Sequence, residues 1–200
     1  IVQALVRGKS QVVNSACFPS QFGCEGDVTK YPYDPAKAKA LLAEAGYPDG
    51  FTIDFYAYRN RDYADAMLNF LSEVGIKANF GYLKYAALRD KIRSKEVPMA
   101  FMTWGSYSIN DVSAITSHFF THGKDDLALD PKVKELLQKG DTTVDSAVRK
   151  QAYSEALKLI AEQAYWLPLW SYNTNYAFSN DVDFTPTSDE IPRFFTASWK

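Results

Sequence analysis

Two stretches of the chain share a pattern that determines where helices end and strands begin. Residues 41–50 read LLAEAGYPDG and residues 70–79 read FLSEVGIKAN. In both stretches a predicted helix with an apolar face is followed directly by a glycine. Gly46 and Gly75 stand where a helix needs a left-handed C-terminal residue, and alternating apolar residues follow each of them. The spacing does not recur a third time, which excludes a repeat array. The pattern therefore indicates one helix-to-strand corner that is used twice.

The first of these helices has a clear beginning at Asp34 and Pro35. An Asp at the N-cap accepts hydrogen bonds from the first amides, and Pro suits the first helical position. The buried face expected for this helix consists of Ala38, Leu41, Leu42 and Ala45. The corresponding face of the second helix consists of Ala64, Met67, Leu68, Leu71 and Val74.

Three strands are expected, with helices between them. Alternation predicts strands at 51–58 and 76–82, and a helix over 84–95 separates the second strand from the apolar run at 99–102. An unbroken apolar run is typical of a strand buried on both faces, so this third strand is expected to be the most buried. The order predicts an α/β fold with a central βαβαβ unit of parallel strands and flanking helices.

Ligands of such sheets bind beyond the carboxyl ends of the strands. This rule marks three loops, at 58–62, 82–85 and 104–111. The first contains Arg59 and Asn60, where an arginine can hold an anion, although solvated loop charges are the alternative. The third supplies the candidate ligand-binding residues Trp104, Gly105, Ser106, Tyr107, Ser108, Asn110 and Asp111. The alternative role is core packing for Trp104 and, for Asp111, capping a helix over 112–120.

Two further helices and an aromatic segment complete the chain. One helix is expected from Asp130 to about Gly140, and another from Asp145 to about Ala164. The expected buried face of the second of these helices consists of Val148, Ala152, Ala156, Leu159, Ile160 and Gln163, and Tyr153 is offset from this face. Residues 165–178, YWLPLWSYNTNYAF, then read as an extended segment. Its aromatic side chains are expected either to pack on a part of the protein outside this chain or to line a ligand cleft.

Charge and histidine content exclude several classes of function. The net charge is −2 and no basic run occurs, so nucleic acid and anionic membrane are not expected partners. His118 and His122 are the two histidines, and they lack both a neighbouring glutamate and an assignable third ligand. No metal site, no cofactor and no catalytic base are therefore predicted. The sequence favours binding over turnover.

The two cysteines, Cys17 and Cys24, lie in the loop NSACFPSQFGCEG. A zinc site would need further ligands nearby, and the spacing differs from the Cys-x-x-Cys of redox motifs. A local disulfide is predicted, with two unrelated buried thiols as the alternative. Such a bond favours an oxidising compartment.

At YDPAKAKALLAEAGYPDGF, residues 33–51, the chain resembles the peptide/nickel/opine class (family 5) of extracytoplasmic solute-binding proteins that serve ABC importers. The opening IVQALVRG and the stretch DTTVDSAVRKQAYSEALKLIAEQAYWLPLW, residues 141–170, are similar to other parts of that class. The resemblance implies a periplasmic-binding-protein-like lobe and a monomeric, periplasmic, non-enzymatic receptor. Its partners would be a small solute, with peptide as the default, and the membrane subunits of an ABC importer. A metal chelate, haem, opine or sugar-like solute is the alternative, as is a chaperone or interaction module outside transport.

The resemblance also implies a domain organisation and a ligand contact. Residues 1–200 would form one lobe of a larger two-lobe receptor, and 165–200 would cross back toward the other lobe. Peptide-binding members often read Trp-x-x-Asp-Tyr-x-x-Pro, with the Asp pairing to a peptide amino terminus. Here Trp104 matches, but Tyr107 stands at the Asp position and Asp111 at the Pro position. We therefore expect a ligand that does not depend on a free α-amino group.

Overall fold

The computed structural model describes residues 1–187 and 191–200, which divide into two compact units. The first unit comprises Ile1, Gln3–Leu5 and Lys30–Thr103. The second comprises Val2, Val6–Thr29 and Trp104–Lys200. Among the residues described, no helix is long and apolar enough to cross a membrane.

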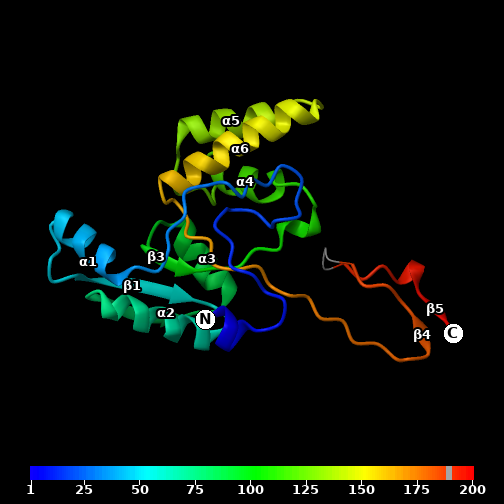
Figure 1. The fold of residues 1–200 in the computed structure, drawn as a ribbon, viewed down its shortest axis with the longest axis horizontal. Coiled ribbons are helices and arrows are strands. Elements are labelled where there is room, and N and C mark those ends of the chain that lie inside the picture. Colours follow the sequence, from blue (N-terminus) through cyan, green and yellow to red (C-terminus); the bar gives the residue numbers. More distant parts are fainter. Residues whose placement is uncertain (188–190) are drawn as a thin grey trace. The chain divides into compact units, whose positions relative to one another are not determined.

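The first unit is built around a three-stranded parallel sheet (Figure 1). Its elements in chain order are α1 (Pro35–Glu44), β1 (Phe51–Ala57), α2 (Arg61–Glu73), β2 (Ile76–Tyr82), α3 (Tyr85–Arg93) and β3 (Met99–Phe101). β1 pairs in parallel with β2 along its whole length and with β3 at its C-terminal end, which gives the order β2-β1-β3. The predicted βαβαβ unit of parallel strands is confirmed.

The two helix-to-strand corners form as their sequences predict. The side chain of Asp34 accepts a hydrogen bond of 2.9 Å from the Lys37 amide, and Pro35 is the first residue of α1. Gly46 and Gly75 both have a backbone φ of +90° after their helices, a conformation that only glycine adopts without strain. Local chemistry thus sets both ends of α1 and the end of α2.

The predicted burial is right for α2 and wrong for α1. Ala64 in α2 is fully buried, and the rest of its predicted stripe is half-buried. In α1 no residue is buried, and Leu41 is 53% exposed. No helix or strand among the described residues packs extensively against α1. Periodicity shows which side chains share a helix face, whereas the element that covers this face is set by long-range packing.

The expectation that the third strand is the most buried is also wrong. β3 is short, excludes Met102, and pairs along one side, with β1. β1 is the central strand, and there Phe55 is 3% exposed and Ala57 0%. Met99 and Ala100 of β3 are half-buried, because an edge strand has a neighbour on one side.

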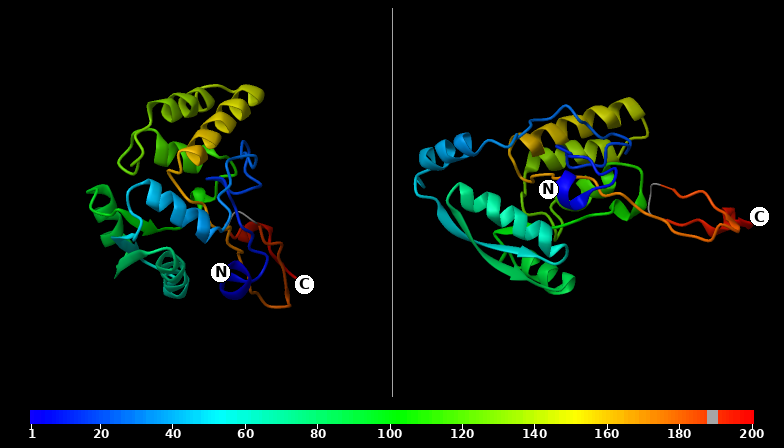
Figure 2. Two further views of the ribbon diagram at one scale, coloured as in Figure 1. Left: turned by 60° about the vertical axis from the view of Figure 1, so that its left-hand side comes forward. Right: turned by 60° about the horizontal axis from the view of Figure 1, so that its bottom comes forward.

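The second unit is mainly helical. Its elements are η2 (Ser106–Ser108), α4 (Ser113–Phe120), α5 (Pro131–Asp141), α6 (Ser146–Glu162), β4 (Val182–Asp183), η3 (Phe194–Thr196) and β5 (Ser198–Trp199); η1 (Val2–Val6) precedes them. α5 and α6 lie side by side as a hairpin (Figures 1 and 2). Asp130 and Asp145 cap these helices as predicted, each accepting hydrogen bonds from two backbone amides.

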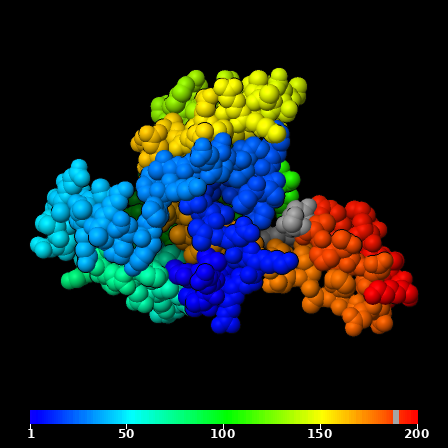
Figure 3. All heavy atoms as spheres, in the orientation of Figure 1, coloured from blue at the N-terminus to red at the C-terminus, as the bar shows by residue number. Residues whose placement is uncertain are grey.

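Tyr153 is buried more deeply than its predicted offset from the α6 stripe suggests. It is 0% exposed, because α6 is covered by α5 on one side and by the segment before α1 on another. Figure 3 shows that segment, in blue, against α6, in yellow. Gly23 and Gly140 touch the Tyr153 ring so closely that a Cβ at either would come within 2.7 Å and 2.5 Å of it. Gln163, expected on the buried side, is exposed.

The aromatic segment 165–178 is extended, as predicted, and part of it packs inside the second unit. Trp170 forms an isolated antiparallel bridge with Val12. The Trp166 ring lies 4.8 Å from the Phe119 ring of α4, centroid to centroid. Trp166 therefore has a partner within its own unit, a third outcome beside the two expected from the sequence.

The predicted disulfide is confirmed. The sulfur atoms of Cys17 and Cys24 are bonded at 2.01 Å, with their Cα atoms 5.7 Å apart. The bond closes a short loop that carries Gln21 and Phe22.

Candidate functional site

The carboxyl end of the sheet in the first unit brings together side chains from two strand ends. Because β2 and β3 lie on opposite sides of β1, the strand order reverses between β1 and β3, and α/β sheets bind ligands at such a reversal. There the hydroxyls of Tyr58 and Thr103 share a hydrogen bond, and Arg59 Nη1 lies 3.4 Å from Thr103 Oγ1. The Tyr85 ring lies 5.2 Å from that of Tyr58.

Arg59 and Asn60 are held together at this edge. Arg59 Nε donates a hydrogen bond of 3.0 Å to Asn60 Oδ1, and Asn60 has a left-handed backbone with φ of 51° just before α2. The predicted loop 58–62 is shorter than expected, since Arg61 and Asp62 already belong to α2. The other candidate residues, from Trp104 onward, belong to the second unit.

The backbone of the 104–111 loop contains a single left-handed turn. Ser106, Tyr107 and Ser108 have φ values of 52°, 50° and 59°. This conformation costs a non-glycine residue about 1–2 kcal/mol, so three in succession need support from outside the turn. The turn is closed by hydrogen bonds of 2.9 Å from the Ser108 amide to the Gly105 carbonyl and from the Ile109 amide to the Ser106 carbonyl. Strain of this kind often accompanies functional sites.

Trp104 lies at the centre of an aromatic cluster. Its ring stacks on His118 at 4.8 Å and meets Tyr107 and Phe119 edge-on, each at 4.9 Å. Its indole Nε1 is buried and has no hydrogen-bond partner among the described residues. Trp104 is half-buried, whereas Tyr107 is 62% exposed. The cluster thus has a packed inner part and an exposed tyrosine at its surface.

An open pocket of about 250 Å³ lies at this loop, lined by Trp104, Gly105, Tyr107 and Ser108. Sites that enclose a small molecule usually have volumes of roughly 300–1,000 Å³. This pocket is smaller than that range, so it suits one wall of a binding site better than a complete one.

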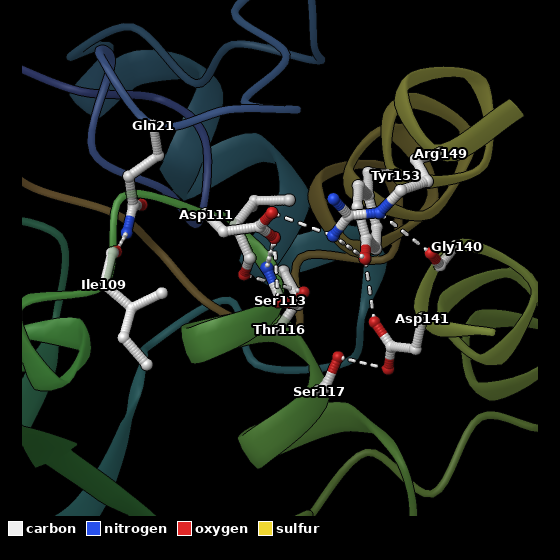
Figure 4. A network of polar contacts seen from close by, with 11 residues as sticks. Gln21, Ile109, Asp111, Ser113, Thr116, Ser117, Gly140, Asp141, Arg149 and Tyr153 are labelled. Atoms are coloured by element: carbon white, nitrogen blue, oxygen red, sulfur yellow. Dashed lines mark hydrogen bonds and ion pairs between the residues drawn. The ribbon is translucent and has the colours of Figure 1, made fainter. Parts of the chain in front are cut away.

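Asp111 ends the loop and is engaged by protein groups at both oxygens (Figure 4). Its Oδ1 accepts hydrogen bonds from the amide and hydroxyl of Ser113, at 3.0 and 2.8 Å. Its Oδ2 forms an ion pair of 2.8 Å with Arg149 Nη2. Asp111 therefore accepts hydrogen bonds from the first residue of α4, although Val112 and not Asp111 is the N-cap; this is close to the capping role considered as the alternative from the sequence. Asn110 is exposed, and its carbonyl accepts a hydrogen bond from the Phe22 amide.

Arg149 connects Asp111 to the α5–α6 hairpin. Its Nε donates to the Gly140 carbonyl at 3.1 Å, and its Nη2 donates to the Tyr153 hydroxyl at 3.0 Å (Figure 4). The Tyr153 hydroxyl donates in turn to Asp141 Oδ1 at 2.8 Å. The hydrogen bond to Tyr153 and the interaction with Asp111 raise the pKa of Arg149 above its usual value, against the opposing effect of burial. The guanidinium therefore stays charged and fixes the end of the loop.

The two histidines do not form a metal site. His118 Nε2 lies 2.9 Å from Asp125 Oδ2, and the His122 amide donates to Asp126. No group of three or more ligating side chains that could hold a metal ion occurs in the described part of the chain. His118 instead supplies a flat ring under Trp104.

Comparison with known proteins identifies the family to which this chain belongs. Residues 1–126 match the family model described as bacterial extracellular solute-binding proteins, family 5, middle region. The chain belongs to this family. Family 5 proteins are receptors that bind solutes outside the cytoplasm, and they are not enzymes. The match also supports the extracytoplasmic location expected from the sequence.

Several relatives of this family 5 chain carry descriptions of their solutes. It is 30% identical over 154 residues to the glutathione-binding protein GsiB of Salmonella paratyphi A, covering 70% of this chain and 30% of that protein. It is 23% identical over 203 residues to heme-binding protein A of Haemophilus influenzae, covering 96% and 36%. The chain therefore spans about a third of the length of these curated relatives.

Among solved structures, the dipeptide-binding protein of Pseudoalteromonas sp. SM9913, in complex with Met-Leu, superposes with a TM-score of 0.84. It is 25% identical, and the match covers 99% of this chain and 42% of that one. The agropinic-acid complex of AgaA from A. tumefaciens R10 gives a TM-score of 0.72 at 25% identity, covering 87% and 38%. Both are similar to this family 5 chain in fold.

The position of the binding loop in this family 5 protein was predictable from the sequence, but the residues that support the loop were not. His118 and Phe119 were visible as an aromatic pair in SHFFTHG, yet their packing on Trp104 is not readable from spacing. Gln21 and Arg149 contact the loop from distant parts of the chain. The position of Asp111 just before a predicted helix was the one signal in the sequence that its carboxylate bonds to protein groups.

Proposed function

We propose that this chain is part of a receptor that binds a peptide or a similar small solute and delivers it to an ABC importer. The 104–111 loop forms one wall of the ligand site. Family membership supports the receptor role, and the likeness to a dipeptide-binding structure, at 25% identity and a TM-score of 0.84, supports peptide as the first ligand class to test. The differing solutes named for its relatives make glutathione and haem the next ones.

One observation carries the assignment of the loop. The strained turn at Ser106–Ser108 presents Tyr107, 62% exposed, beside a half-buried Trp104 at an open pocket. A turn that merely connected two elements would gain nothing from three left-handed residues, whereas a ligand site needs side chains held in a fixed geometry. Aromatic faces with nearby polar groups are typical of small-molecule sites.

The chemistry of the loop favours ligands without a required ammonium group. At the position where peptide-binding relatives of this class often carry an Asp, Tyr107 offers a hydroxyl and an aromatic face, which suit hydroxyls, carbonyls or rings. Asp111, the nearest carboxylate in the loop, is already paired with Arg149 and with the Ser113 amide. Arg59 and Asn60, in the other unit, remain proposed contacts for an anionic or carbonyl group.

Substitution of Trp104 by Ala tests the proposed site. Calorimetry on the receptor with Met-Leu, glutathione and hemin identifies the solute that binds, and the variant is then compared with wild type for that solute. We expect affinity to fall by at least about tenfold, or 1.4 kcal/mol. Val144→Ala is the control, because Val144 is 100% exposed between α5 and α6 and lies outside the proposed site. A sharp drop in melting temperature with unchanged affinity of the folded fraction would instead make Trp104 a core residue.

N-acetylation of a bound peptide tests the ligand class. If Met-Leu binds, we expect acetyl-Met-Leu to bind within about tenfold of it, since no carboxylate of the loop is available for an ammonium group. A loss of a hundredfold or more would show that an acidic anchor exists, and the interpretation of Tyr107 would fail.

We further propose that residues 1–200 form one lobe of a two-lobe receptor and that 165–200 crosses toward the other lobe. The chain aligns with only part of each relative, for example with 42% of the dipeptide-binding protein, which supports its being one part of a larger receptor. Exposed aromatic side chains near the end of the chain also support it: Phe194, Phe195 and Trp199 are 73%, 86% and 80% exposed. Slower amide exchange over 191–200 in the two-lobe receptor than in this chain alone would be the expected result; equal exchange would refute the crossing.

A further inference from the structure

The loop closed by the disulfide lies directly on the backbone of the candidate binding loop. Gln21 Nε2 donates a hydrogen bond of 3.0 Å to the Ile109 carbonyl (Figure 4). The Phe22 amide donates to the Asn110 carbonyl at 3.2 Å, and the Phe22 carbonyl accepts from the Val112 amide at 3.0 Å. Two residues of the disulfide loop thus make hydrogen bonds to three backbone groups within residues 109–112.

Both polar atoms of the Gln21 side-chain amide are engaged in this contact. It is 8% exposed, and its Oε1 accepts a hydrogen bond of 2.9 Å from the Phe18 amide while its Nε2 reaches Ile109. Phe18 and Gln21 both lie between Cys17 and Cys24 in the chain. The geometry that aims Gln21 at Ile109 is therefore set inside the ring that the disulfide closes.

Arg149 adds a second support at the same place. Its guanidinium lies 4.9 Å from the centre of the Phe22 ring and pairs with Asp111. The disulfide loop, the arginine and the end of the binding loop form one continuous set of contacts. The other end of the binding loop is held by Trp104, which packs on His118 and Phe119. Between these two anchors lies the strained turn at 106–108, whose own closing hydrogen bonds run from Ser108 and Ile109.

We propose that the Cys17–Cys24 disulfide is a positioning element for the 104–111 loop. It keeps Gln21 and Phe22 in place on residues 109–112 and thereby holds the left-handed turn that presents Tyr107. The two cysteines are seven positions apart in the sequence, and without the bond the segment between them becomes flexible. The contacts to 109–112 are then lost, and the turn relaxes toward a less strained backbone. The importance of this order for binding rests on the function proposed above.

Hydrogen exchange measured by mass spectrometry tests the positioning without any ligand. The Cys17→Ser/Cys24→Ser double variant of the receptor is compared with the oxidised wild type. We expect amides in 105–112, which include those of Ser108, Ile109 and Val112, to exchange at least about tenfold faster in the variant. Exchange in α5 should not change, because its hydrogen bonds do not pass through the disulfide loop.

Two single substitutions keep the test decisive if the double variant does not fold. Gln21→Ala leaves the disulfide intact but removes the bond to the Ile109 carbonyl, and should accelerate exchange in 105–112 in the same direction. Ser20→Ala, at an exposed neighbour in the same loop, should leave exchange there as in wild type. Unchanged exchange in 105–112 for both Gln21→Ala and the cysteine variant would overturn the inference, as would an equal rise in α5.

Binding then separates this inference from the proposed function. With the solute identified by calorimetry, the cysteine variant should bind at least about tenfold more weakly than wild type. Faster exchange in 105–112 together with weaker binding supports both. The cysteine variant could show faster exchange but full affinity while Trp104→Ala binds weakly. This result would overturn the role of the disulfide in binding. Faster exchange with full affinity in Trp104→Ala would remove the proposed site and leave the positioning of the loop intact.

Discussion

Removal of the Tyr153 hydroxyl should lower the free energy of unfolding at pH 8, and this loss should become smaller as the pH rises above 10. Tyr153 is 0% exposed, and burial raises its pKa from the usual value of 10.0 to about 12; the Arg149 hydrogen bond opposes this rise and the Asp141 hydrogen bond adds to it. The folded protein therefore holds this proton at pH values where the unfolded chain has already released it. Below pH 10 both states are protonated, so the stability contributed by the neutral phenol is fully present there and is lost as pH rises toward 12.

The magnitude follows from the size of the shift. One pKa unit corresponds to about 1.4 kcal/mol, so raising the pH from 10 to 12 removes at most about 2.7 kcal/mol from the free energy of unfolding. At pH 8, Tyr153→Phe loses two partly buried hydrogen bonds, at 3.0 and 2.8 Å, which should cost about 1–3 kcal/mol. At pH 11.5 wild type has lost about 2 kcal/mol that the Phe variant cannot lose, so the two stabilities should converge.

Urea unfolding followed by circular dichroism at pH 8 and pH 11.5 measures this convergence. The other titrating groups are common to both proteins and cancel in the difference between them. Tyr47→Phe is the control, because its ring is 51% exposed, and it should differ little from wild type at either pH. A difference between wild type and Tyr153→Phe that is the same at pH 8 and pH 11.5 would refute the burial argument.

Two further predictions concern the backbone. Gly50→Ala should lower the free energy of unfolding by more than about 2 kcal/mol, since a Cβ there would lie 2.0 Å from the Gly75 carbonyl oxygen and φ is +78°. Gly46→Ala, with φ of +90° but no atom within 4 Å, should cost only about 1–2 kcal/mol; equal losses in thermal unfolding would contradict the clash. Asp145→Ala removes the acceptor for two amides of α6 and should cost about 1 kcal/mol, and a loss below about 0.3 kcal/mol in urea unfolding would mean that water replaces the cap.

Local chemistry in the sequence determined the elements of this fold. Asp34 and Pro35 start a helix, and Gly46 and Gly75 end helices, because caps and left-handed residues act within a few positions along the chain. The alternation after each glycine produced strands, and helices between them required parallel pairing. The disulfide was also readable, since its cysteines are close in sequence.

The candidate site was readable only in part. The rule that ligands bind beyond the carboxyl ends of parallel strands located the 104–111 loop, and the departure at Tyr107 from the pattern of the class was visible at once. The left-handed turn was not predictable, because Ser and Tyr have no intrinsic preference for it, and contacts from outside the turn impose it.

The tertiary structure alone decided which strand is central, which helix face is covered and what holds the loop. β1 and not β3 is central because β2 and β3 lie on opposite sides of it, a choice that neither strand's composition reveals. Gln21 meets Ile109 and Arg149 meets Asp111 across long stretches of chain. Propensities and caps act between neighbours in sequence, whereas these contacts form only once packing has brought distant segments together, so they are properties of the folded chain.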